Sequence, residues 1–426
     1  MQRRELSKLL LASAATTAAV TETAKAQSCT LPCYPQTAKE VTAQVIPVNT
    51  AYLPGDVRRY GADPTGKVSS VQAINNAAAC GGEIFFGGSG ATYLIDAPIV
   101  FFGNGFVLQG LGRDVTTLQL ATATQSNGIV TTGTIIFGDQ NRAAQTHNYE
   151  LRDMTVNTYE RNTVTKAVQC LLAGWTHIEN VLFFQINGSA IYAEQSWDCR
   201  VTLCHFDYCG SANNPVISLN YIAGSAAENN HWSVSDCQLE ASYWIDIQMV
   251  GVSDEADHFI NRCKFGVPSY VIQSAPDTAQ YHIYGLNLVG TSIVDNWFFS
   301  GGMAYMSNCN SYKIQANHGR FLSQGVWDDG GGGSSYLISG NHIYGNNSSN
   351  TTTGSLSTNH WGIRVGGYNG AVGPGNDVAL FSVNYLVWTS AINNFVLLPQ
   401  SGSVAASVAG GEIVDGGTTT RIQTIG

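Results

Sequence analysis

The sequence predicts an all-β chain folded as a parallel β-helix, a solenoid in which short strands stack in successive rungs. Three observations support this prediction. A six-residue pattern recurs eight times between residues 178 and 386, with a plausible ninth copy at 151. The runs that carry it are rich in Val, Ile, Phe, Tyr, Thr and Trp and alternate with a period of two. Only 12% of the residues are charged and 46 are glycine, which is untypical of amphipathic helical repeats.

Each copy has an apolar residue at positions one and six and a small or medium residue, often Asn or Cys, at position four. Copies begin about 21 to 33 residues apart, with one gap of about 43, which matches one rung of a solenoid. The copies are Leu151–Val156, Ile178–Phe183, Val201–Phe206, Val234–Leu239, Ile260–Phe265, Ile293–Phe298, Ile314–Gly319, Ile338–Ile343 and Phe381–Leu386. A unit this short cannot bury its own apolar face, so the copies must stack. Residues 55–426 then form one long domain, preceded by a linker over residues 27–54.

The motif itself indicates how each copy bends. Positions four and six point inward on one strand, because side chains of a strand alternate between its faces. Position one points inward as well only if the chain turns across positions two and three. Asn suits a stacked turn, since it tolerates left-handed backbone conformations and can hydrogen-bond to the copies above and below. The predicted ladders are Asn296, Asn317, Asn341 and Asn384, and, as a stack of buried thiols, Cys204, Cys237 and Cys263.

The first 26 residues have the pattern of an export signal. Arg3 and Arg4 give a positively charged start, a weakly apolar run extends from Leu9 to Val20, and a small-x-small cleavage site ends at Ala26. The arginine pair resembles a bacterial twin-arginine signal, and about 12 apolar residues are too few to span a bilayer. We therefore expect a bacterial protein that is exported to the periplasm or the medium, with residues 1–26 removed during export.

The charge balance restricts the class of partner. The expected signal carries four basic and two acidic side chains, so its removal changes the formal net charge from −10 to −12. An excess of negative charge argues against nucleic acid, and against a membrane surface once the signal is gone. An acidic polysaccharide can still be held by local basic residues.

Ten cysteines in an exported protein would ordinarily indicate a disulfide framework. Cargo of the twin-arginine route, however, folds in the reducing cytoplasm before export. We therefore expect only Cys29 and Cys33, just after the cleavage site, to pair. No cysteine has zinc-like spacing with histidine, so no metal site is predicted from cysteine. No cofactor is expected to be required; calcium stays an open alternative, although no concentrated carboxylate loop demands it.

The N-terminal part of the domain contains a capping element. Asp56–Gly66 is expected to form a strand and a Gly-rich turn. A short amphipathic helix over residues 71–78 follows, with Ser69 or Ser70 as its N-cap. This helix would close one end of the solenoid, whose apolar interior otherwise meets water. The first strands are expected at 82–86, 92–95 and 107–112.

The run Tyr-Gly-Ala-Asp-x-x-Gly at Tyr60–Gly66, followed by an Ala-Ile helix, a strand and Tyr-Leu-Ile at 93–95, resembles the N-terminal end of the pectate-lyase-like superfamily. That superfamily consists of right-handed parallel β-helices and includes rhamnogalacturonase-like, epimerase-like and phage tailspike-like proteins. The match covers residues 56–120. It departs from the usual form at Lys67–Ser70, where acidic residues are common, and at Gly87–Gly90, where a Pro-Gly turn is common. The resemblance implies a single-stranded right-handed β-helix with a polysaccharide-related role, but the motif set of polygalacturonases is absent, so no catalytic residue is carried over.

Stacking of the copies predicts one continuous strip of surface residues. Position five and the residue after position six point outward on the same strand, about 4.8 Å from their equivalents on the next rung. Position five is Leu182, His205, Gln238, Lys264, Trp297, His318, His342 and Tyr385. The residue after position six is Phe184, Asp207, Glu240, Gly266, Phe299, Arg320, Tyr344 and Val387. Aromatic faces interspersed with polar groups are what a sugar needs. The predicted substrate-binding residues are Trp297, Phe299, His318, Arg320, His342 and Tyr344.

Four residues at one end of the strip are candidate catalytic groups. Asp207 and Glu240 lie on neighbouring rungs, where their repulsion raises one pKa and provides an acid and a base for glycoside hydrolysis. Retention of configuration needs a carboxyl separation of about 5 to 5.5 Å, which rung spacing permits. Alternatively, Lys264 or Arg320 neutralises a uronate carboxylate, and His205, His318 or Lys264 acts as the base of a β-elimination. A third interpretation is plain surface decoration, because any exposed β-face carries polar and aromatic residues.

The leading hypothesis is an exported lyase or hydrolase that acts on an acidic or plant-type polysaccharide in a groove along the β-helix. The alternatives are a non-catalytic glycan-binding or tailspike-like adhesion protein and a stiff structural rod. A monomer or, in the tailspike-like case, a homotrimer is expected. Competing clusters on other faces are Glu194 with Trp197, Asp198 and Arg200, and Tyr243 and Trp244 with Asp246. The Gly-rich loop at 330–333, after Trp327–Asp329, is expected to be flexible and able to overhang a groove.

Overall fold

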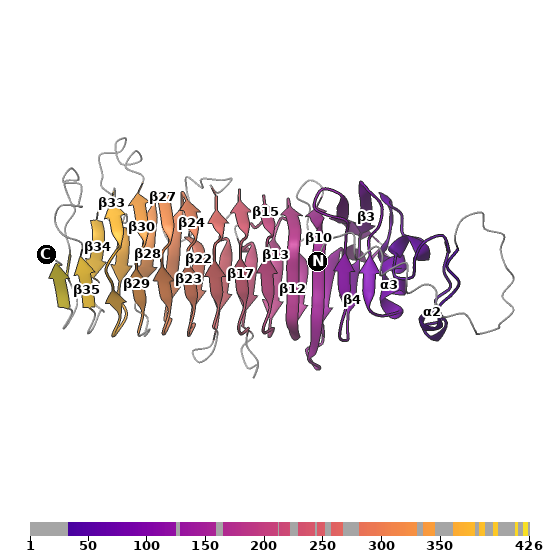
Figure 1. Cartoon of the computed structure of the whole chain (residues 1–426), viewed down its shortest axis with the longest axis horizontal. Coiled ribbons are helices and arrows are strands. Elements are labelled where there is room, and N and C mark those ends of the chain that lie inside the picture. The colour runs from indigo at the N-terminus through magenta and orange to yellow at the C-terminus, as the bar shows by residue number, and fades with distance from the viewer. Residues whose placement is uncertain are drawn as a thin grey trace, which may run out of the picture.

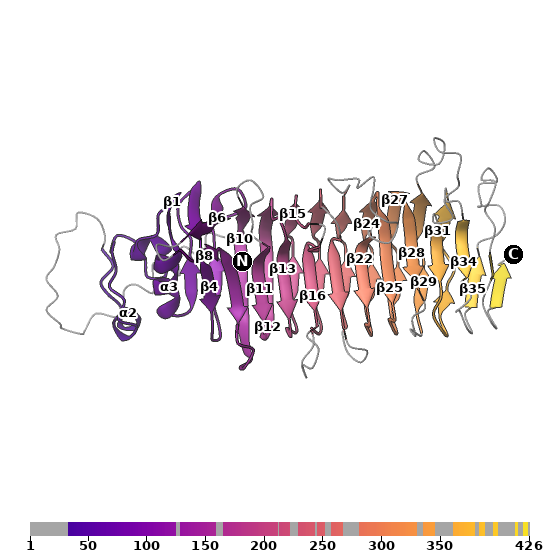
Figure 2. The same cartoon turned by 180° about the vertical axis from the view of Figure 1, so that it is seen from behind.

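The computed structural model describes residues 33–124, 128–158, 165–211, 213–221, 229–242, 245–251, 257–266, 281–329, 335–345, 361–379, 383–387, 395–398, 414–415 and 421–424. Parallel strands of successive rungs lie side by side along a rod, with the N-terminal helices at one end and the last strands at the other (Figures 1 and 2). The predicted fold class is confirmed: the chain is an all-β, single-stranded right-handed parallel β-helix with a short N-terminal capping helix.

A typical rung consists of three strands. In one of them β14 (Arg200–Thr202) and β15 (His205–Asp207) are separated by a two-residue bend and belong to the larger sheet. β16 (Ile217–Asn220) belongs to the second sheet, which faces the first across the core. We call the strands before the bend the first leg and those after it the second leg. The predicted succession of strand, bend and strand is thereby confirmed.

The remaining strands follow the same division. The first leg also contains β2 (Glu83–Phe85), β5 (Val107–Gln109), β17 (Ser233–Ser235), β20 (Phe259–Asn261), β23 (Ser292–Val294), β26 (Lys313–Gln315), β29 (Leu337–Ser339), β32 (Ala371–Val372), β35 (Phe395–Leu398) and β37 (Arg421–Thr424). The second leg contains β1 (Thr65–Ser69), β3 (Ala91–Ile95), β6 (Thr116–Leu120), β18 (Gln238–Glu240), β21 (Lys264–Phe265), β24 (Trp297–Phe299), β27 (His318–Leu322), β30 (His342–Gly345) and β33 (Asp377–Ala379). β10 (Thr146–Thr158) and β12 (Ala173–Phe184) run through both legs.

The second sheet contains β4 (Pro98–Phe101), β9 (Thr134–Gly138), β11 (Lys166–Leu171), β13 (Ser189–Glu194), β19 (Ile247–Val250), β22 (Tyr281–Leu286), β25 (Gly302–Ser307), β28 (Gln324–Asp328), β31 (Trp361–Val365), β34 (Val383–Val387) and β36 (Val414–Asp415). β7 (Thr122–Thr124) and β8 (Val130–Thr132) form a small antiparallel hairpin beside it. The strands predicted at 82–86, 92–95 and 107–112 correspond to β2, β3 and β5.

The bend between the legs uses a left-handed residue at position three of the motif. Leu203, Arg262 and Ala316 occupy this position with φ of 56°, 51° and 55°. The turn across positions two and three is thus confirmed, but the expectation that Asn supplies the left-handed conformation is wrong. The strained residue is the one before it, and it is held there because the strands on both sides are fixed by the sheet.

Position four forms one column rather than two separate ladders. Within the column, the buried Cys263 donates its N–H to the Asn296 side-chain oxygen at 2.9 Å, so the thiols run directly into the asparagines. Each buried Asn then bonds to the next, as the Asn317 amide does to Asn341 Oδ1 at 3.0 Å. The last member in the described chain is Asn376, which bonds to Asn341. The prediction of Asn384 is wrong, because Asn384 lies in β34 of the second sheet.

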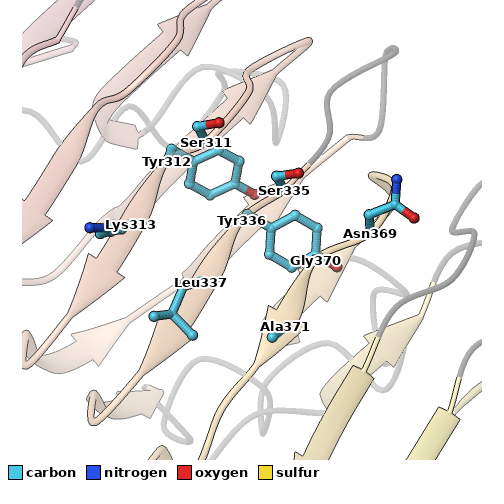
Figure 3. Close-up of a pocket in the computed structure, with 9 residues that line it drawn as sticks. All are labelled: Ser311, Tyr312, Lys313, Ser335, Tyr336, Leu337, Asn369, Gly370 and Ala371. Atoms are coloured by element: carbon cyan, nitrogen blue, oxygen red, sulfur yellow. The ribbon is translucent and has the colours of Figure 1, made fainter.

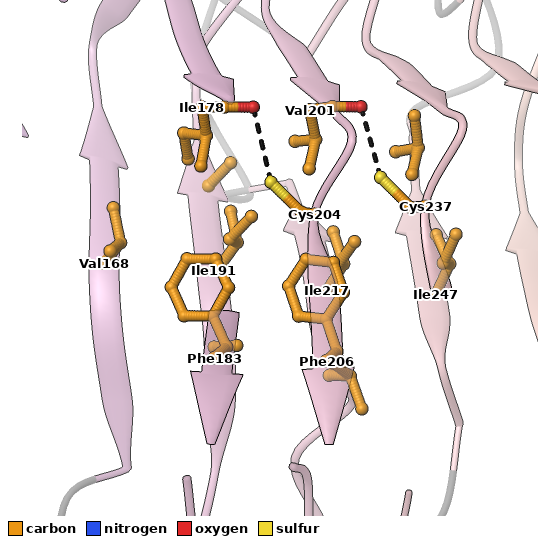
Figure 4. Packing of buried hydrophobic residues seen from close by; sticks show 14 of the residues in the cluster. Val168, Ile178, Phe183, Ile191, Val201, Cys204, Phe206, Ile217, Cys237 and Ile247 are labelled. Carbon is orange, nitrogen blue, oxygen red and sulfur yellow. Dashed lines mark hydrogen bonds between the residues drawn. The ribbon is translucent and has the colours of Figure 1, made fainter. Parts of the chain in front are cut away.

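Apolar side chains of all three strands fill the interior. Position six provides an aromatic stack, with the Phe183 and Phe206 rings 5.0 Å apart and nearly parallel. Figure 4 shows these rings facing Ile191 and Ile217 of the second sheet, while the Cys204 thiol points at the Ile178 carbonyl. Because every rung repeats this arrangement, the outward residues of each leg are held in register over the length of the rod.

The N-terminal end is closed by helices. α3 (Val71–Ala79) buries Ala73, Ile74 and Ala77, as expected for the capping helix. Its N-cap is Ser70, which makes no side-chain capping bond. The strand expected at the start of Asp56–Gly66 is instead the 3-10 helix η2 (Val57–Tyr60), because Asp56 caps it and Gly61 ends it with φ of 95°.

The segment before residue 55 contains α2 (Ala38–Thr42) and packs through a buried ion pair. Glu40 and Arg59 are both fully buried, with Arg59 Nε donating to Glu40 Oε1 at 2.6 Å. Burial raises the pKa of Glu40, but hydrogen bonds from Arg59, Thr37 and Tyr60 outweigh it and bring the pKa to about 2. This pair therefore fastens the segment to η2.

The described cysteines divide into two groups. Cys33 is disulfide-bonded, and its expected partner, Cys29, lies outside the described residues. The thiols of Cys204, Cys237 and Cys263 are free and buried, which confirms the predicted stack. Burial also raises the pKa of the Cys237 thiol well above its usual range, so the stack is unreactive packing rather than chemistry.

Candidate functional site

The predicted strip exists in the register that the motif indicates. Along the second leg, His205 pairs with Gln238, Gln238 with Lys264, and Lys264 with Trp297. Beside them Asp207 pairs with Glu240. The structure therefore brings the four predicted catalytic residues onto three neighbouring rungs.

Asp207 and Glu240 differ in their surroundings. Burial raises the pKa of Asp207, with the charge of Glu240 adding to the effect and His205 opposing it. Burial acts on Glu240 in the same direction, but hydrogen bonds from Lys264 and Gln238 lower the pKa of Glu240 overall. The two neighbouring carboxyl groups thus titrate in opposite directions from their ordinary values.

The basic residues at this end lie close to Glu240. Lys264 Nζ is 3.0 Å from Glu240 Oε1, and His205 Nε2 is 3.7 Å from Glu240 Oε2. The Lys264 side chain is 60% exposed, so its ammonium group reaches solvent beside the carboxylate. This position suits recognition of a substrate anion more than abstraction of a proton.

The middle of the strip is aromatic. Trp297 is 54% exposed and its ring stacks on His318 with centroids 4.3 Å apart. Phe299 is also exposed and meets Phe321 edge to face at 5.2 Å. Arg320 Nε donates to His318 Nε2 at 3.0 Å, which orients the imidazole ring. These exposed aromatic rings provide flat apolar faces on which sugar rings can stack.

The far end of the strip differs from the prediction. His342 follows His318, as expected, but the next rung contributes Asp377 and Ala379 rather than Tyr385 and Val387. Asp377 accepts a hydrogen bond from the Tyr344 hydroxyl and lies 3.6 Å from His342 Nδ1. The last motif copy was placed in the wrong sheet, so these two strip assignments are wrong.

Two exposed aromatic residues beside the strip were missed from the sequence. Phe321 is 53% exposed and Tyr208 is 43% exposed. Both have positive φ, of 56° and 53°; Phe321 lies within β27, and Tyr208 directly follows β15. The signal that would have found them is an aromatic residue directly after the outward residues Arg320 and Asp207.

The competing clusters lie mainly on other faces. Glu194 of β13 accepts hydrogen bonds from Arg142 and from the Tyr192 hydroxyl. Lys166 Nζ lies 3.3 Å from the centre of the Tyr192 ring, so this group is closed on itself. Asp246 is buried and bonds to His282 at 2.5 Å, which makes it structural. Tyr243, Trp244 and the loop at 330–333 lie outside the described residues.

The outer face of the second sheet carries a further aromatic row that sequence analysis missed. Tyr284 and Tyr305 stack with centroids 5.0 Å apart, and Trp327 meets Tyr305 edge to face at 4.8 Å. The Arg364 guanidinium lies 4.3 Å above the Trp327 ring. Tyr305 also donates to Asp329 at 2.5 Å. These rings are packed on one another and are only partly exposed.

Hollows lie along the first leg of the described rod. Two of about 370 and 490 Å³ adjoin at Asp198 and Arg200. Another, of about 540 Å³, lies further along the same leg, where the Tyr312 and Tyr336 rings stand beside Lys313 (Figure 3). The predicted strip is a face of the rod, with exposed rings projecting from it.

Two further observations concern ligands and membranes. In the part of the chain that the structure describes, no group of three or more His, Cys, Asp or Glu side chains is arranged to hold a metal ion. Among the described residues, no helix combines the length and apolar character needed to cross a bilayer.

Comparison with known proteins yields likeness in structure only. No family model matches the chain, and no curated protein matches its sequence. The ORF18 protein of Geobacillus virus E2 is 17% identical with a TM-score of 0.54 over 68% of this chain, which spans 56% of that protein's length. A mutant tailspike protein of E. coli bacteriophage HK620, in complex with a pentasaccharide, is 12% identical with a TM-score of 0.50, covering 86% of this chain and 80% of the tailspike. A PL6 family alginate lyase, AlyGC, is 11% identical with a TM-score of 0.48, covering 82% of this chain and 46% of the lyase. At these identities the likeness concerns the fold, and it agrees with the resemblance to pectate-lyase-like β-helices.

Proposed function

We propose that this protein is an exported carbohydrate-active protein that binds an acidic or plant-type polysaccharide along the strip. Asp207 and Glu240 are the groups that cleave the polysaccharide. One observation carries the proposal. Two carboxyl groups on neighbouring rungs have pKa values displaced in opposite directions, beside a row of exposed aromatic rings. Sites that use one carboxyl as acid and another as base have this arrangement.

The proposed reaction is hydrolysis of a glycosidic bond. Asp207, whose pKa is raised, donates its proton to the glycosidic oxygen as the bond from that oxygen to the anomeric carbon breaks. Glu240, whose pKa is lowered, bonds to the anomeric carbon as a carboxylate. Water then displaces Glu240, and Asp207 takes up the proton of that water. Strand spacing of about 4.8 Å favours this retaining course over an inverting one, which needs about 6.5 to 9.5 Å.

The surrounding residues position the chain of sugars. Lys264 neutralises a uronate carboxylate next to the cleaved bond, and His205 holds Glu240 from the other side. Trp297 and Phe299 stack on sugar rings further along, where His318, Arg320, His342 and Tyr344 supply hydrogen bonds. A variant of this proposal is β-elimination, in which His205 is the base and Lys264 neutralises the uronate carboxylate.

A second candidate function is glycan binding without cleavage. The exposed rings of Trp297, Phe299 and Phe321 support it, because stacking faces need no acid or base. The structure of the mutant HK620 tailspike is a complex with a pentasaccharide, and binding of an oligosaccharide by this chain belongs to this alternative. The proposal includes export by a twin-arginine signal, which analysis of the N-terminus of the exported protein tests. It also includes a monomeric state or, for adhesion, a trimeric state, which light scattering tests.

The deciding experiment is incubation with pectic, alginate and bacterial polysaccharides, with and without calcium. Reducing ends and absorbance of unsaturated uronates are followed together. Reducing ends alone are expected, and they should vanish in Asp207→Asn and Glu240→Gln. Absorbance rising in parallel would establish elimination instead. Saturable binding with no new ends on any polymer would leave the adhesion function, and neither binding nor cleavage would refute both.

A further inference from the structure

A second group of residues stands on the first-leg face and takes no part in the strip. Trp175, at the start of β12, and Asp198 and His231, which precede β14 and β17, lie on successive rungs joined by backbone bridges through Trp197. Next to them, Arg200 begins β14 and pairs in register with Ser233 of β17. The two adjoining hollows are lined by these residues and by the first-leg strands.

The face is bounded by two exposed aromatic rings. Trp175 is 52% exposed and lines the smaller hollow. Its indole N–H donates to Asp198 Oδ2 at 3.2 Å, and the His147 ring lies 5.0 Å from it. At the other end, Phe259 is 42% exposed and lines the larger hollow. An indole that is held at its edge and remains half exposed is organised for stacking, since little entropy is lost when a sugar ring settles on it.

Hydrogen-bond donors and acceptors lie between the rings of Trp175 and Phe259. His231 is placed between two carboxylates, with Nδ1 3.4 Å from Asp198 and Nε2 3.4 Å from Asp257. Arg200 is exposed and lines both hollows. Carboxylates accept from sugar hydroxyls and a guanidinium donates to them, so one ring can be held on both sides.

The formal charges of the arginines and carboxylates on this face sum to −1. Arg262 is held by a two-pronged pair with Asp236, both bonds being 2.7 Å. What remains is one arginine against Asp198 and Asp257. A uronate or sulfated sugar would be repelled by the two carboxylates, whereas a neutral ring with several hydroxyl groups meets a donor and acceptors without charge conflict.

We infer that this face is a second carbohydrate site, which takes one or two rings of a neutral hexose or pentose with Trp175 as the stacking platform. The site goes beyond the function proposed above, because it lies on another face and needs no cleavage. Asp198 accepts from the sugar hydroxyls, His231 accepts from or donates to them, and Arg200 donates from the lining of both hollows. Hollows of about 370 and 490 Å³ are of the size that binds a small ligand.

The test uses neutral tetrasaccharides (cello-, xylo-, manno- and galacto-) and trigalacturonate as probes, with Kd measured by calorimetry on the mature protein. At least one neutral probe is expected to bind. Trp175→Ala and Arg200→Gln should each weaken it by about tenfold, which corresponds to about 1.4 kcal/mol. Lys313→Gln is the matched control, because it removes an exposed cation from the same column of first-leg positions, four rungs or about 19 Å away.

The outcomes separate this site from the strip. Trp297→Ala should leave the Kd for the neutral probe unchanged, whatever it does to polysaccharide cleavage. The inference is overturned if no neutral probe binds, if trigalacturonate alone binds, or if Trp175→Ala and Lys313→Gln have the same effect. Because Trp175 is exposed, the variant should keep the unfolding midpoint of the natural chain, and a changed Kd then reports the site itself.

Discussion

Replacing Asn317 by Ala should destabilise the β-helix far more than the loss of one surface contact. The Asn317 side chain makes four hydrogen bonds in the buried column. Its amide donates to the Ile293 carbonyl at 2.9 Å and to Asn341 Oδ1 at 3.0 Å, and its oxygen accepts from the N–H and from the amide of Asn296, both at 3.0 Å. The substitution removes all four and leaves the buried backbone N–H of Asn296 without this acceptor.

The expected magnitude follows from these bonds. A buried donor left unsatisfied costs about 1 to 3 kcal/mol, and each of the other three neutral bonds contributes roughly 0.5 to 1.5 kcal/mol. The variant should therefore lose about 2.5 to 7.5 kcal/mol of unfolding free energy. Cys237→Ala is the matched control in the same column. Its thiol reaches the Val201 carbonyl at 3.5 Å and is a weak donor, so about 1 kcal/mol is expected.

Urea unfolding of both variants measures the difference, and hydrogen exchange localises it. In Asn317→Ala the amide of Asn296 should exchange faster, whereas Cys237→Ala should leave it protected. Equal destabilisation of the two variants, with unchanged protection at Asn296, would refute the idea that the amide ladder is the main polar support of the bends.

Four further outcomes are expected. Glu40, with a folded pKa of about 2 against an ordinary 4.5, stabilises the chain above pH 4.5; this contribution of about 3 kcal/mol disappears as the pH falls from 4.5 towards 2, and urea titrations of Glu40→Gln should lack that slope. Leu203→Gly should raise the unfolding free energy by about 0.5 to 1 kcal/mol, because Leu203 is exposed at φ 56°, whereas Thr202→Gly in the adjacent strand should lower it. Trp297→Ala should weaken polysaccharide binding by about 0.5 to 1.5 kcal/mol in affinity electrophoresis, and an unaltered mobility shift would remove Trp297 from the site. With Asp207 as the acid, hydrolysis should decline as the pH rises through the raised pKa of Asp207, because the proton to be donated is then lost; a rate that increases towards alkaline pH would exclude this assignment.

The repeat made much of the second leg predictable. A strand has a period of two, so six residues from Ile178 or Val201 fix which side chains face the core and which face outward. Stacking then places His205 beside Gln238 and Asp207 beside Glu240 without any knowledge of the turns. For the same reason the thiol column was visible in the sequence.

The errors come from places where the repeat changes length. The copy at Val372–Val378 is seven residues long, because Gly373, Pro374 and Gly375 lengthen its bend. The six-residue pattern therefore missed it and matched Phe381–Leu386 in the second sheet instead. Asn376 and Asp377 were lost from the column and the strip in this way.

The residues of the first-leg face lie at a fixed offset from the repeat. Trp175, Asp198, His231 and Asp257 each stand three residues before position one of a copy, which is Ile178, Val201, Val234 and Ile260. This offset was not predicted, because these residues precede the apolar pattern and share no residue type. Backbone bridges place the segments of the first three on successive rungs.

The most direct test of the central proposal compares Asp207→Asn with Trp297→Ala on whichever polysaccharide the natural chain cleaves, measuring kcat and Kd for both. The account predicts that Asp207→Asn abolishes turnover with an almost unchanged Kd, whereas Trp297→Ala raises Kd and retains most of kcat. An unchanged kcat in both Asp207→Asn and Glu240→Gln would contradict the account and place the catalytic groups on another face of the rod.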